Sequence, residues 1–347
     1  MSEPLSLEHF DYALPPAQIA QHPLPERDAA RLMVLDRSGE STEHGRVRDL
    51  LRWLRPGDLL VGNASRVRPA RLRGCKESGG AADALLLGLL PDTPCQYRAL
   101  LRCSGRLRKG QKFRFGTEAE TIEAELIDVS ESGEVTLAFA TDVSPYAVGE
   151  MPLPPYIRRD RPDPEDRDRY QTVFACDPGS VAAPTAGLHL TASLLGDLVG
   201  RNVGWADVIL HVGPGTFRPL RPEDLAAGRL HPEHFELPAA TAAAVARTRA
   251  AGGRVVAVGT TTTRVLETCA SEGGLVEPAE SQTDLFIRTG FRFRVVDALL
   301  TNFHLPRSSL LLLVAAFAGR ERVLDAYAEA VAKGYRFYSY GDAMLIL

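Results

Sequence analysis

The chain has 347 residues, of which 45% are hydrophobic and 24% charged, and its formal net charge is −4. This composition is typical of a globular protein with one large or two modest domains. The five cysteines are scattered and form no CxxC pair, so we expect neither a disulfide framework nor a zinc site. The first residues lack a secretory signal, and the most apolar run (308–319) is too short to span a bilayer. We therefore predict a cytoplasmic protein without a membrane anchor.

The small net charge hides two segments of opposite sign. Residues 65–114 carry twelve Lys and Arg against three Asp and Glu, whereas residues 115–200 carry five against sixteen. The runs 65–76 and 102–114 contain no acidic residue. Such runs can form a contact surface for nucleic-acid phosphates or simply a solvated basic face, and the sequence leaves both alternatives open.

The first 140 residues contain two different patterns. Apolar runs at 31–36 and 57–63 predict buried strands, and the segment 47–54 between them predicts a helix, so the chain starts as a β-α-β unit. From residue 66 onward the chain shows only strand-length segments separated by turns, which is typical of a small antiparallel barrel or sandwich. These expected strands are 83–90, 96–102, 111–115, 121–129 and 134–140.

Beyond a proline-rich stretch at 151–157, helices and strands alternate again, as in α/β layer folds. We therefore predict a layered α/β domain (1–65 and 152–347) interrupted by an inserted antiparallel β-barrel domain (66–151). The expected helices are 192–200, 238–253, 260–271 and 320–334, and the expected strands are 205–212, 254–259, 283–287 and a strand pair within 335–347.

Four polar loops lie at the ends of these elements, where ligands of open α/β sheets bind. They are PTAGLHLT (184–191), HVGPGTFRPL (211–220), VGTTTTR (258–264) and TNFHLPRSS (301–309). The second loop has the spacing of neither a P-loop nor a GxGxxG motif. In the third loop, Arg264 lies in the first turn of a helix, where its charge opposes the helix dipole unless it faces an anion. Each loop also has a purely structural interpretation, as a turn or a helix cap.

Taken together, these segments resemble the S-adenosylmethionine:tRNA ribosyltransferase-isomerase family of the queuosine pathway. The resemblance spans the chain: besides PTAGLHLT and HVGPGTFRPL, it includes residues 10–35, TDLFI (283–287), residues 299–319 and YRFYSYGDAMLI (335–346). The chain departs from the family at GNASRV (62–67), where the family reads like FNDTRV. Asn63, Arg66 and Val67 are kept, whereas the aromatic and acidic residues are missing.

The resemblance implies an α/β domain with an inserted barrel, and a reaction on tRNA. The ribosyl part of S-adenosylmethionine is transferred to the aminomethyl group of 7-aminomethyl-7-deazaguanine (preQ1) at the anticodon wobble position and isomerised to an epoxycyclopentanediol. Adenine and methionine leave, and epoxyqueuosine remains in the tRNA. S-adenosylmethionine is thus a consumed substrate, so we expect no cofactor and no metal. The expected partners are this tRNA and S-adenosylmethionine, with no membrane and no obligate protein partner.

This reaction needs a base beside the sulfonium, and a histidine with a near-neutral pKa suits that task. We expect His189 or His211 to serve as base or proton relay, and we expect the threonine helix start with Arg264 to hold the methionine carboxylate. Asp284 could pair with the methionine ammonium or a ribose hydroxyl, and Asn302 and His304 could recognise adenine or the deazaguanine. The full predicted substrate-binding set is Thr185, Gly187, Gly213, Gly215, Thr216, Arg218, Thr260, Arg264, Asp284, Asn302 and His304. The predicted tRNA-binding set is Arg66, Arg68, Arg106, Arg108, Lys109 and Lys112.

Two rival interpretations remain at this stage. One is an S-adenosylmethionine-dependent RNA methyltransferase, although no glycine-rich loop follows the first predicted strand. The other is a non-catalytic RNA-binding protein, although a binding barrel would not need the histidine-bearing loops. The motif HPEH (231–234) places two histidines three residues apart without a third ligand, so it does not predict a metal site.

Overall fold

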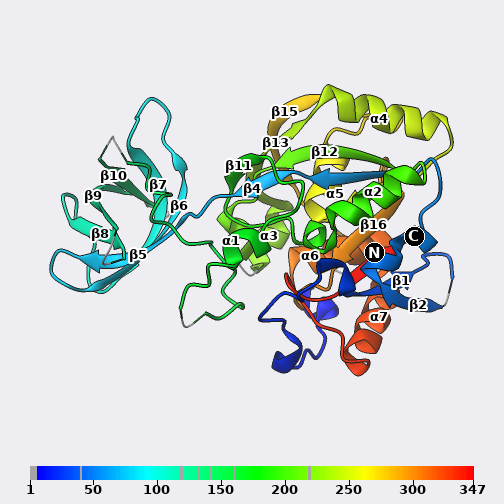
Figure 1. Ribbon diagram of the computed structural model, residues 1–347, viewed down its shortest axis with the longest axis horizontal. Helices are drawn as coiled ribbons and strands as arrows, with labels where there is room; N and C mark the ends of the chain where they lie inside the picture. Colours follow the sequence, from blue (N-terminus) through cyan, green and yellow to red (C-terminus); the bar gives the residue numbers. More distant parts are fainter. Residues whose placement is uncertain are drawn as a thin grey trace.

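The computed structural model describes residues 6–39, 41–117, 120–131, 133–140, 143–159, 161–217 and 220–347. Figure 1 shows a small barrel on one side of a larger α/β body. This arrangement confirms the predicted fold class, an α/β domain with an inserted antiparallel barrel. Among the described helices, none has the length and apolar character needed to cross a bilayer.

The α/β body is built on a sheet of nine strands in the order β15-β13-β12-β3-β14-β16-β17-β1-β2. The central strands β12, β3, β14 and β16 are parallel, whereas β13 and β17 run antiparallel to their inner neighbours. The central strands are continuous apolar runs because both faces of a parallel sheet are covered. The strands are β1 (Arg31–Leu35), β2 (Thr42–Arg46), β3 (Leu59–Asn63), β12 (Gly204–Leu210), β13 (Arg229–Leu237), β14 (Val255–Val258), β15 (Ala279–Leu285), β16 (Ala298–Asn302) and β17 (Ala343–Ile346).

Helices cover both faces of this sheet and bury one apolar cluster on each. One cluster includes side chains of α4, α5, α6 and α7, and the other includes side chains of α2 and the 3-10 helix η4. Thr191 and Ser308 cap α2 and α6, because each side-chain oxygen accepts a hydrogen bond from the backbone N–H three residues later. The helices are α1 (Asp166–Arg169), α2 (Ala192–Gly200), α3 (Pro222–Ala227), α4 (Ala239–Ala250), α5 (Thr260–Thr268), α6 (Ser309–Ala318), α7 (Arg320–Ala332), η1 (Leu7–Phe10), η2 (Pro16–Gln18), η3 (Arg27–Ala29), η4 (Val47–Arg52), η5 (Thr185–His189) and η6 (Pro214–Phe217).

The inserted barrel closes six strands in the order β10-β7-β6-β5-β8-β9. Its strands alternate inward apolar and outward polar residues, and in β9 the inward side chains are Ile122, Ala124 and Leu126. Gly74 is required where β5 meets β8, because a Cβ there would lie 2.0 Å from the carbonyl oxygen of Arg114. The strands are β5 (Arg71–Lys76), β6 (Ala81–Leu89), β7 (Gln96–Cys103), β8 (Lys112–Gly116), β9 (Thr121–Val129) and β10 (Val135–Phe139).

The chain enters and returns from the barrel through two strands that lie side by side. Strand β4 (Ser65–Val67) leads out, β11 (Asp177–Ser180) follows the return, and the two pair in parallel. The Ser180 hydroxyl donates to the Ser65 hydroxyl at 2.8 Å. The predicted domain boundaries at 65/66 and 151/152 stay predictions, and the described barrel strands lie between them.

Two expectations about local structure were wrong, and one edge strand of the large sheet was not predicted. The segment 47–54 forms a 3-10 helix, and β1 and β3 are separated in the sheet by β14, β16 and β17, so the start is not a β-α-β unit. The strand β2 went unpredicted because Thr42–Arg46 has no apolar alternation. The expected pair within 335–347 is the single strand β17, because the Asp342 carboxylate accepts backbone N–H groups of Arg31 and Arg336 and shapes the preceding segment into a turn.

Candidate active site

A cavity of about 1910 Å³ lies between the barrel and the α/β body. The outer face of the barrel contributes Leu87 of β6, Arg98 and Leu100 of β7, and Glu134, the residue before β10. The opposite wall is formed by the ends of α/β strands and the loops that follow them. More than half of the residues in three of the four polar loops (211–220, 258–264 and 301–309) line the cavity. This location matches the expectation that ligands bind beyond the carboxyl ends of parallel strands.

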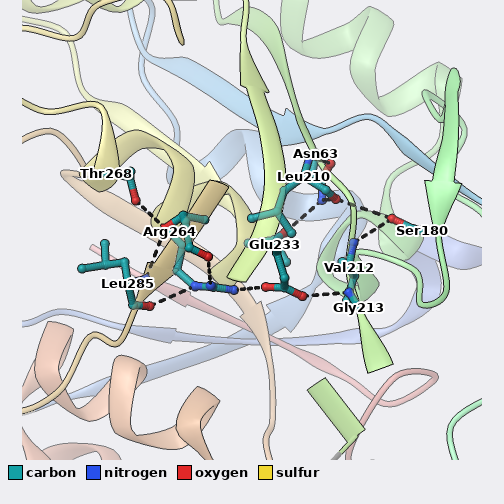
Figure 2. A network of polar contacts seen from close by, with 11 residues as sticks. Asn63, Ser180, Leu210, Val212, Gly213, Glu233, Arg264, Thr268 and Leu285 are labelled. Atoms are coloured by element: carbon teal, nitrogen blue, oxygen red, sulfur yellow. Dashed lines mark hydrogen bonds and ion pairs between the residues drawn. The ribbon is translucent and has the colours of Figure 1, made fainter. Parts of the chain in front are cut away.

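The loop after β12 is held in place by hydrogen bonds from three directions (Figure 2). The His211 backbone N–H donates to the carbonyl of His234 at 2.9 Å, and the Val212 N–H donates to the Ser180 hydroxyl at 3.0 Å. The Gly213 N–H donates to the Glu233 carboxylate at 2.8 Å. The loop is therefore fixed before any ligand arrives, and His211, Gly213 and Gly215 line the cavity.

Arg264 and Glu233 form a buried ion pair beside this loop (Figure 2). The remaining nitrogens of the guanidinium donate to the backbone carbonyls of Leu285 and Thr283 at 3.1 and 3.2 Å. Although Arg264 lines the cavity as predicted, its charge is already compensated by a carboxylate of the protein. Because α5 begins at Thr260, Arg264 lies in its second turn and not in the first, and the anion that it faces is Glu233 of β13.

His211 is half-buried in the cavity wall. Of the two candidate bases, His211 is partly exposed and His189 is buried. Its Nε2 lies 3.4 Å from the Asp177 carboxylate, its ring stacks on His234 at 5.7 Å, and its Nδ1 has no hydrogen-bond partner among the described residues. Burial lowers the pKa of His211, the Asp177 charge opposes that shift, and His234 adds to it. The imidazole is therefore neutral near pH 7 and able to accept a proton.

His189 is placed differently. It is only 4% exposed, it does not line the large cavity, and it borders a small pocket behind it with Arg27 and Tyr340. Its Nε2 lies 3.1 Å from the amide nitrogen of Asn302. Burial lowers the pKa of His189 to about 4, so the ring is neutral and its Nε2 accepts the hydrogen bond from Asn302. The structure thus separates the two candidate histidines by the wall of the cavity.

Asn302, the last residue of β16, and His304 both lie in the cavity wall but differ in their hydrogen bonds. Asn302 lines the cavity, its amide nitrogen also donates to the carbonyl of Tyr338 at 2.9 Å, and its Oδ1 has no partner in the described chain. His304 also lines the cavity, but its Nε2 lies 2.8 Å from the Thr301 hydroxyl. Burial lowers the pKa of His304 to about 3, so this imidazole is neutral as well.

Comparison with known proteins identifies the family. The queuosine biosynthesis protein family matches residues 7–346. A protein of Syntrophotalea carbinolica named S-adenosylmethionine:tRNA ribosyltransferase-isomerase is 48% identical over 99% of this chain and 100% of its own length. A protein of the same name from Geobacter sulfurreducens is 49% identical over 97% and 98% of the two chains. The crystal structure of S-adenosylmethionine tRNA ribosyltransferase from Thermotoga maritima is 38% identical, with a TM-score of 0.55 and coverage of 98% and 100%.

The chain belongs to the queuosine biosynthesis protein family. Its departure from the family pattern at GNASRV lies where β3 ends, in the centre of the sheet. A Cβ at Gly62 would lie 2.5 Å from the Trp205 ring, so tryptophan and its neighbour Phe174 occupy the space beside this glycine. Asn63 still binds both backbone groups of Leu210, at 3.0 Å each, and so anchors the end of β12 (Figure 2).

The other predicted substrate-binding residues are only partly brought together. Thr185 and Thr260 line the cavity, whereas Gly187 does not, because it packs against Phe174 and Thr172. Asp284 lies outside the cavity on β15, with its carboxylate 3.9 Å from Arg229. Arg218 and the side chain of Thr216 lie outside the described residues.

The predicted tRNA-binding residues form two groups. Arg66 lies on β4, which leads to the barrel, and Arg68 directly follows this strand. Arg68 donates to the carbonyl of Pro178, and its guanidinium lies 5.2 Å from the centre of the Tyr146 ring. The other group is exposed on the barrel and consists of Arg106, Arg108, Lys109 and Lys112. Within it, Lys109 pairs with Asp128. In the described chain, no three His, Cys, Asp or Glu side chains gather as metal ligands.

Tyr338 is among the cavity residues that were not predicted from the sequence. Tyr338 has a φ of +71°, a left-handed conformation that costs a bulky residue about 1–3 kcal/mol. Its ring stacks on Tyr156 at 4.4 Å, both rings line the cavity, and the Tyr338 hydroxyl has no partner among the described residues. The aromatic run YRFYSYG could have indicated it, but the same run also reads as a strand.

Proposed function

We propose that this chain is an S-adenosylmethionine:tRNA ribosyltransferase-isomerase. In this function the enzyme transfers and isomerises the ribosyl part of S-adenosylmethionine onto the preQ1 base at the tRNA wobble position, and releases adenine and methionine. The observation that carries the proposal is the 48% identity to a protein of this name over essentially the full length of both chains. S-adenosylmethionine is consumed as a substrate, and the reaction needs no cofactor.

The cavity supports this proposal by its size and its two walls. A volume of about 1910 Å³ exceeds the usual range for small-molecule pockets, as expected where one small substrate and a base of a macromolecule must meet. The α/β wall holds most of the polar groups, and the barrel carries exposed basic residues that lie outside the cavity lining. S-adenosylmethionine would bind against the α/β wall, while the barrel would contact the tRNA backbone through Arg106, Arg108 and Lys109.

His211 is the base in this proposal. The positive sulfonium acidifies the adjacent ribose carbon, and a neutral imidazole that borders the cavity takes the proton from that carbon. The carboxylate of Asp177, 3.4 Å from Nε2, stabilises the imidazolium that forms. His189 is a poor base because it is buried outside the cavity and its Nε2 already accepts a hydrogen bond.

The methionine carboxylate would bind at the N-terminus of α5. Since Arg264 is neutralised by Glu233, the backbone N–H groups around Thr260 and Thr261 supply the positive end of the helix instead. Thr261 also accepts a weak hydrogen bond from Asn63 at 3.3 Å, which ties this helix start to the central strand β3.

The test is to incubate the protein with labelled S-adenosylmethionine and tRNA carrying the preQ1 base, and to identify the products. We expect adenine, methionine and a modified tRNA. Release of S-adenosylhomocysteine would indicate a methyltransferase, and binding without turnover would indicate an RNA-binding protein. Either result would contradict the proposal. A tRNA with unmodified guanine at the wobble position is the matched control and should give no product.

A further inference from the structure

Asn302 lines the cavity and has a buried hydrogen-bond acceptor without a partner in the described part of the chain. The residue is 2% exposed, it lines the cavity, and its Oδ1 has no partner in the described part of the chain. Buried polar atoms in folded proteins are almost always hydrogen-bonded, so an unpartnered one in a cavity wall indicates a ligand that supplies the missing donor.

The other half of the same amide is fully used. Its nitrogen donates one hydrogen bond to the Nε2 of His189 at 3.1 Å and another to the carbonyl of Tyr338 at 2.9 Å. An amide nitrogen has two hydrogens, so both are occupied and the amide cannot rotate without breaking two hydrogen bonds. This arrangement leaves Oδ1, and not the nitrogen, as the atom of the amide that has no partner among the described residues.

His189 can act as an acceptor only while its Nε2 is unprotonated. A protonated ring would present an N–H to the amide nitrogen, and the amide would have to turn its oxygen toward His189 and away from the cavity. Burial keeps the ring neutral and maintains the observed orientation. The Tyr338 hydroxyl is a second buried polar atom without a partner among the described residues, and Tyr338 also lines the cavity.

We infer that the Oδ1 of Asn302 accepts a hydrogen bond from an N–H group of a bound substrate, and that His189 is a positioning residue that holds the Asn302 amide. This inference rests on the proposed function, whose substrates carry two suitable donors. One is the 6-amino group of the adenine in S-adenosylmethionine, and the other is the aminomethyl group of the modified base in the tRNA. His304 does not share this role, because its Nε2 is bound to Thr301.

The experiment compares ligands that carry or lack each donor. In the first arm, calorimetry gives the Kd of S-adenosylmethionine and of its analogue with unsubstituted purine in place of adenine. In the second arm, the Kd is measured for tRNA carrying 7-aminomethyl-7-deazaguanine and for tRNA carrying 7-deazaguanine. We expect one pair to differ by about 10- to 100-fold in the wild-type protein, because the ligand without the donor leaves a buried acceptor unpaired. In Asn302→Leu the same pair should differ less than threefold.

The wild-type ligand comparison needs no variant, so it stands even if Asn302→Leu fails to fold. If neither pair of ligands differs in the wild-type protein, the inference is overturned. A failure of the proposed function would look different, because the wild-type protein would then release no adenine and no methionine. The arm that shows the difference identifies the adenine or the aminomethyl group as the donor.

The role of His189 is tested by comparing His189→Gln with His189→Ala. The ligand used is the one with the donor from the pair that differs in the wild-type protein. Glutamine offers a carbonyl oxygen that can accept a hydrogen bond from Asn302, so we expect His189→Gln to bind this ligand with a Kd within about threefold of the wild-type value. Alanine offers no acceptor, so we expect His189→Ala to bind it about tenfold more weakly. The pH profile of kcat/KM should be the same in His189→Gln as in the wild-type protein. A loss of the acidic limb of that profile, or equal defects in both variants, would contradict a positioning role. His44→Gln, on the edge strand β2, is the matched control.

Discussion

The two walls of the cavity differ in how completely their polar groups are arranged. The α/β wall contains buried or half-buried histidines and an amide whose hydrogen bonds are fixed by the protein. The barrel wall contributes the apolar side chains of Leu87 and Leu100 and a loose ion pair between Arg98 and Glu134, whose atoms are 3.8 Å apart. The difference indicates that chemistry depends on the α/β wall, whereas the barrel supplies a surface for a large partner.

The largest effect is expected at the α/β wall itself. His211→Ala removes the base, so kcat should fall about 10²- to 10⁴-fold while the Kd of S-adenosylmethionine changes little. Single-turnover release of adenine, measured alongside calorimetry, separates the two quantities. A kcat within threefold of the wild-type value would show that the base is elsewhere, and would remove the functional contrast between the walls.

The second prediction concerns the ion pair that supports the same wall. Glu233→Gln leaves the buried Arg264 without a counter-charge, so the free energy of unfolding should fall by about 3–5 kcal/mol. Denaturant unfolding measures this change. Glu236→Gln is the matched control, because Glu236 is an exposed carboxylate on the same strand and should change stability by less than about 0.5 kcal/mol. Equal losses in both variants would mean that the buried pair has no special role.

The third prediction uses pH to probe the buried histidine. The pKa of His189 is about 4 in the folded protein and about 6.5 in the unfolded chain, so the unfolded chain binds a proton first as the pH falls. His189 therefore lowers stability progressively between about pH 6.5 and pH 4, by roughly 3 kcal/mol in total. His189→Gln should flatten the stability profile over this range. A profile as steep as that of the wild-type protein would place the titration on other groups, such as His304.

The smallest effect is expected at the barrel. Reversing the charges of Arg106, Arg108 and Lys109 should weaken tRNA binding about tenfold and reduce its salt dependence, while the Kd of S-adenosylmethionine stays unchanged. Filter binding at several salt concentrations measures both properties. The control reverses Arg201 and Arg247, which are exposed on the α/β body. If tRNA binding keeps its affinity and its salt dependence, the basic face of the barrel is only a solvated surface.

The sequence predicted the barrel well because its strands obey a simple rule. Each strand alternates inward and outward residues, and glycine and proline mark most turns, so β9 was located at its observed bounds. Strand β13 was missed, because Pro232 and the charged residues around it hide its alternation. Strand β5 was missed for a similar reason, since its basic residues dominate the pattern.

The site was harder to predict, because its key contacts join residues that are distant in the sequence. All four loops were recognised, and most of their candidate residues line the cavity. The sequence cannot show that Glu233 neutralises Arg264, since the two residues lie 31 positions apart. It also cannot show that His189 lies behind the cavity wall while His211 lies in it, because only tertiary packing decides which side of a loop is buried.

The insertion of the barrel between β3 and its partner strands also affects how the chain folds. The barrel strands pair with one another within residues 71–139, and Arg71 forms one further bridge with Glu150. The contacts of the segment around β3 are more distant in the sequence: Asn63 binds Leu210, 147 residues later, and Asp58 binds Arg254, 196 residues later. Ordering such long loops is slow, because their closure entropy must be overcome before the contacts form. We therefore expect the barrel to fold first as an autonomous unit, and its compact form to bring β4 and β11 together. The slow step of folding is then the assembly of the central sheet around a domain that has already formed.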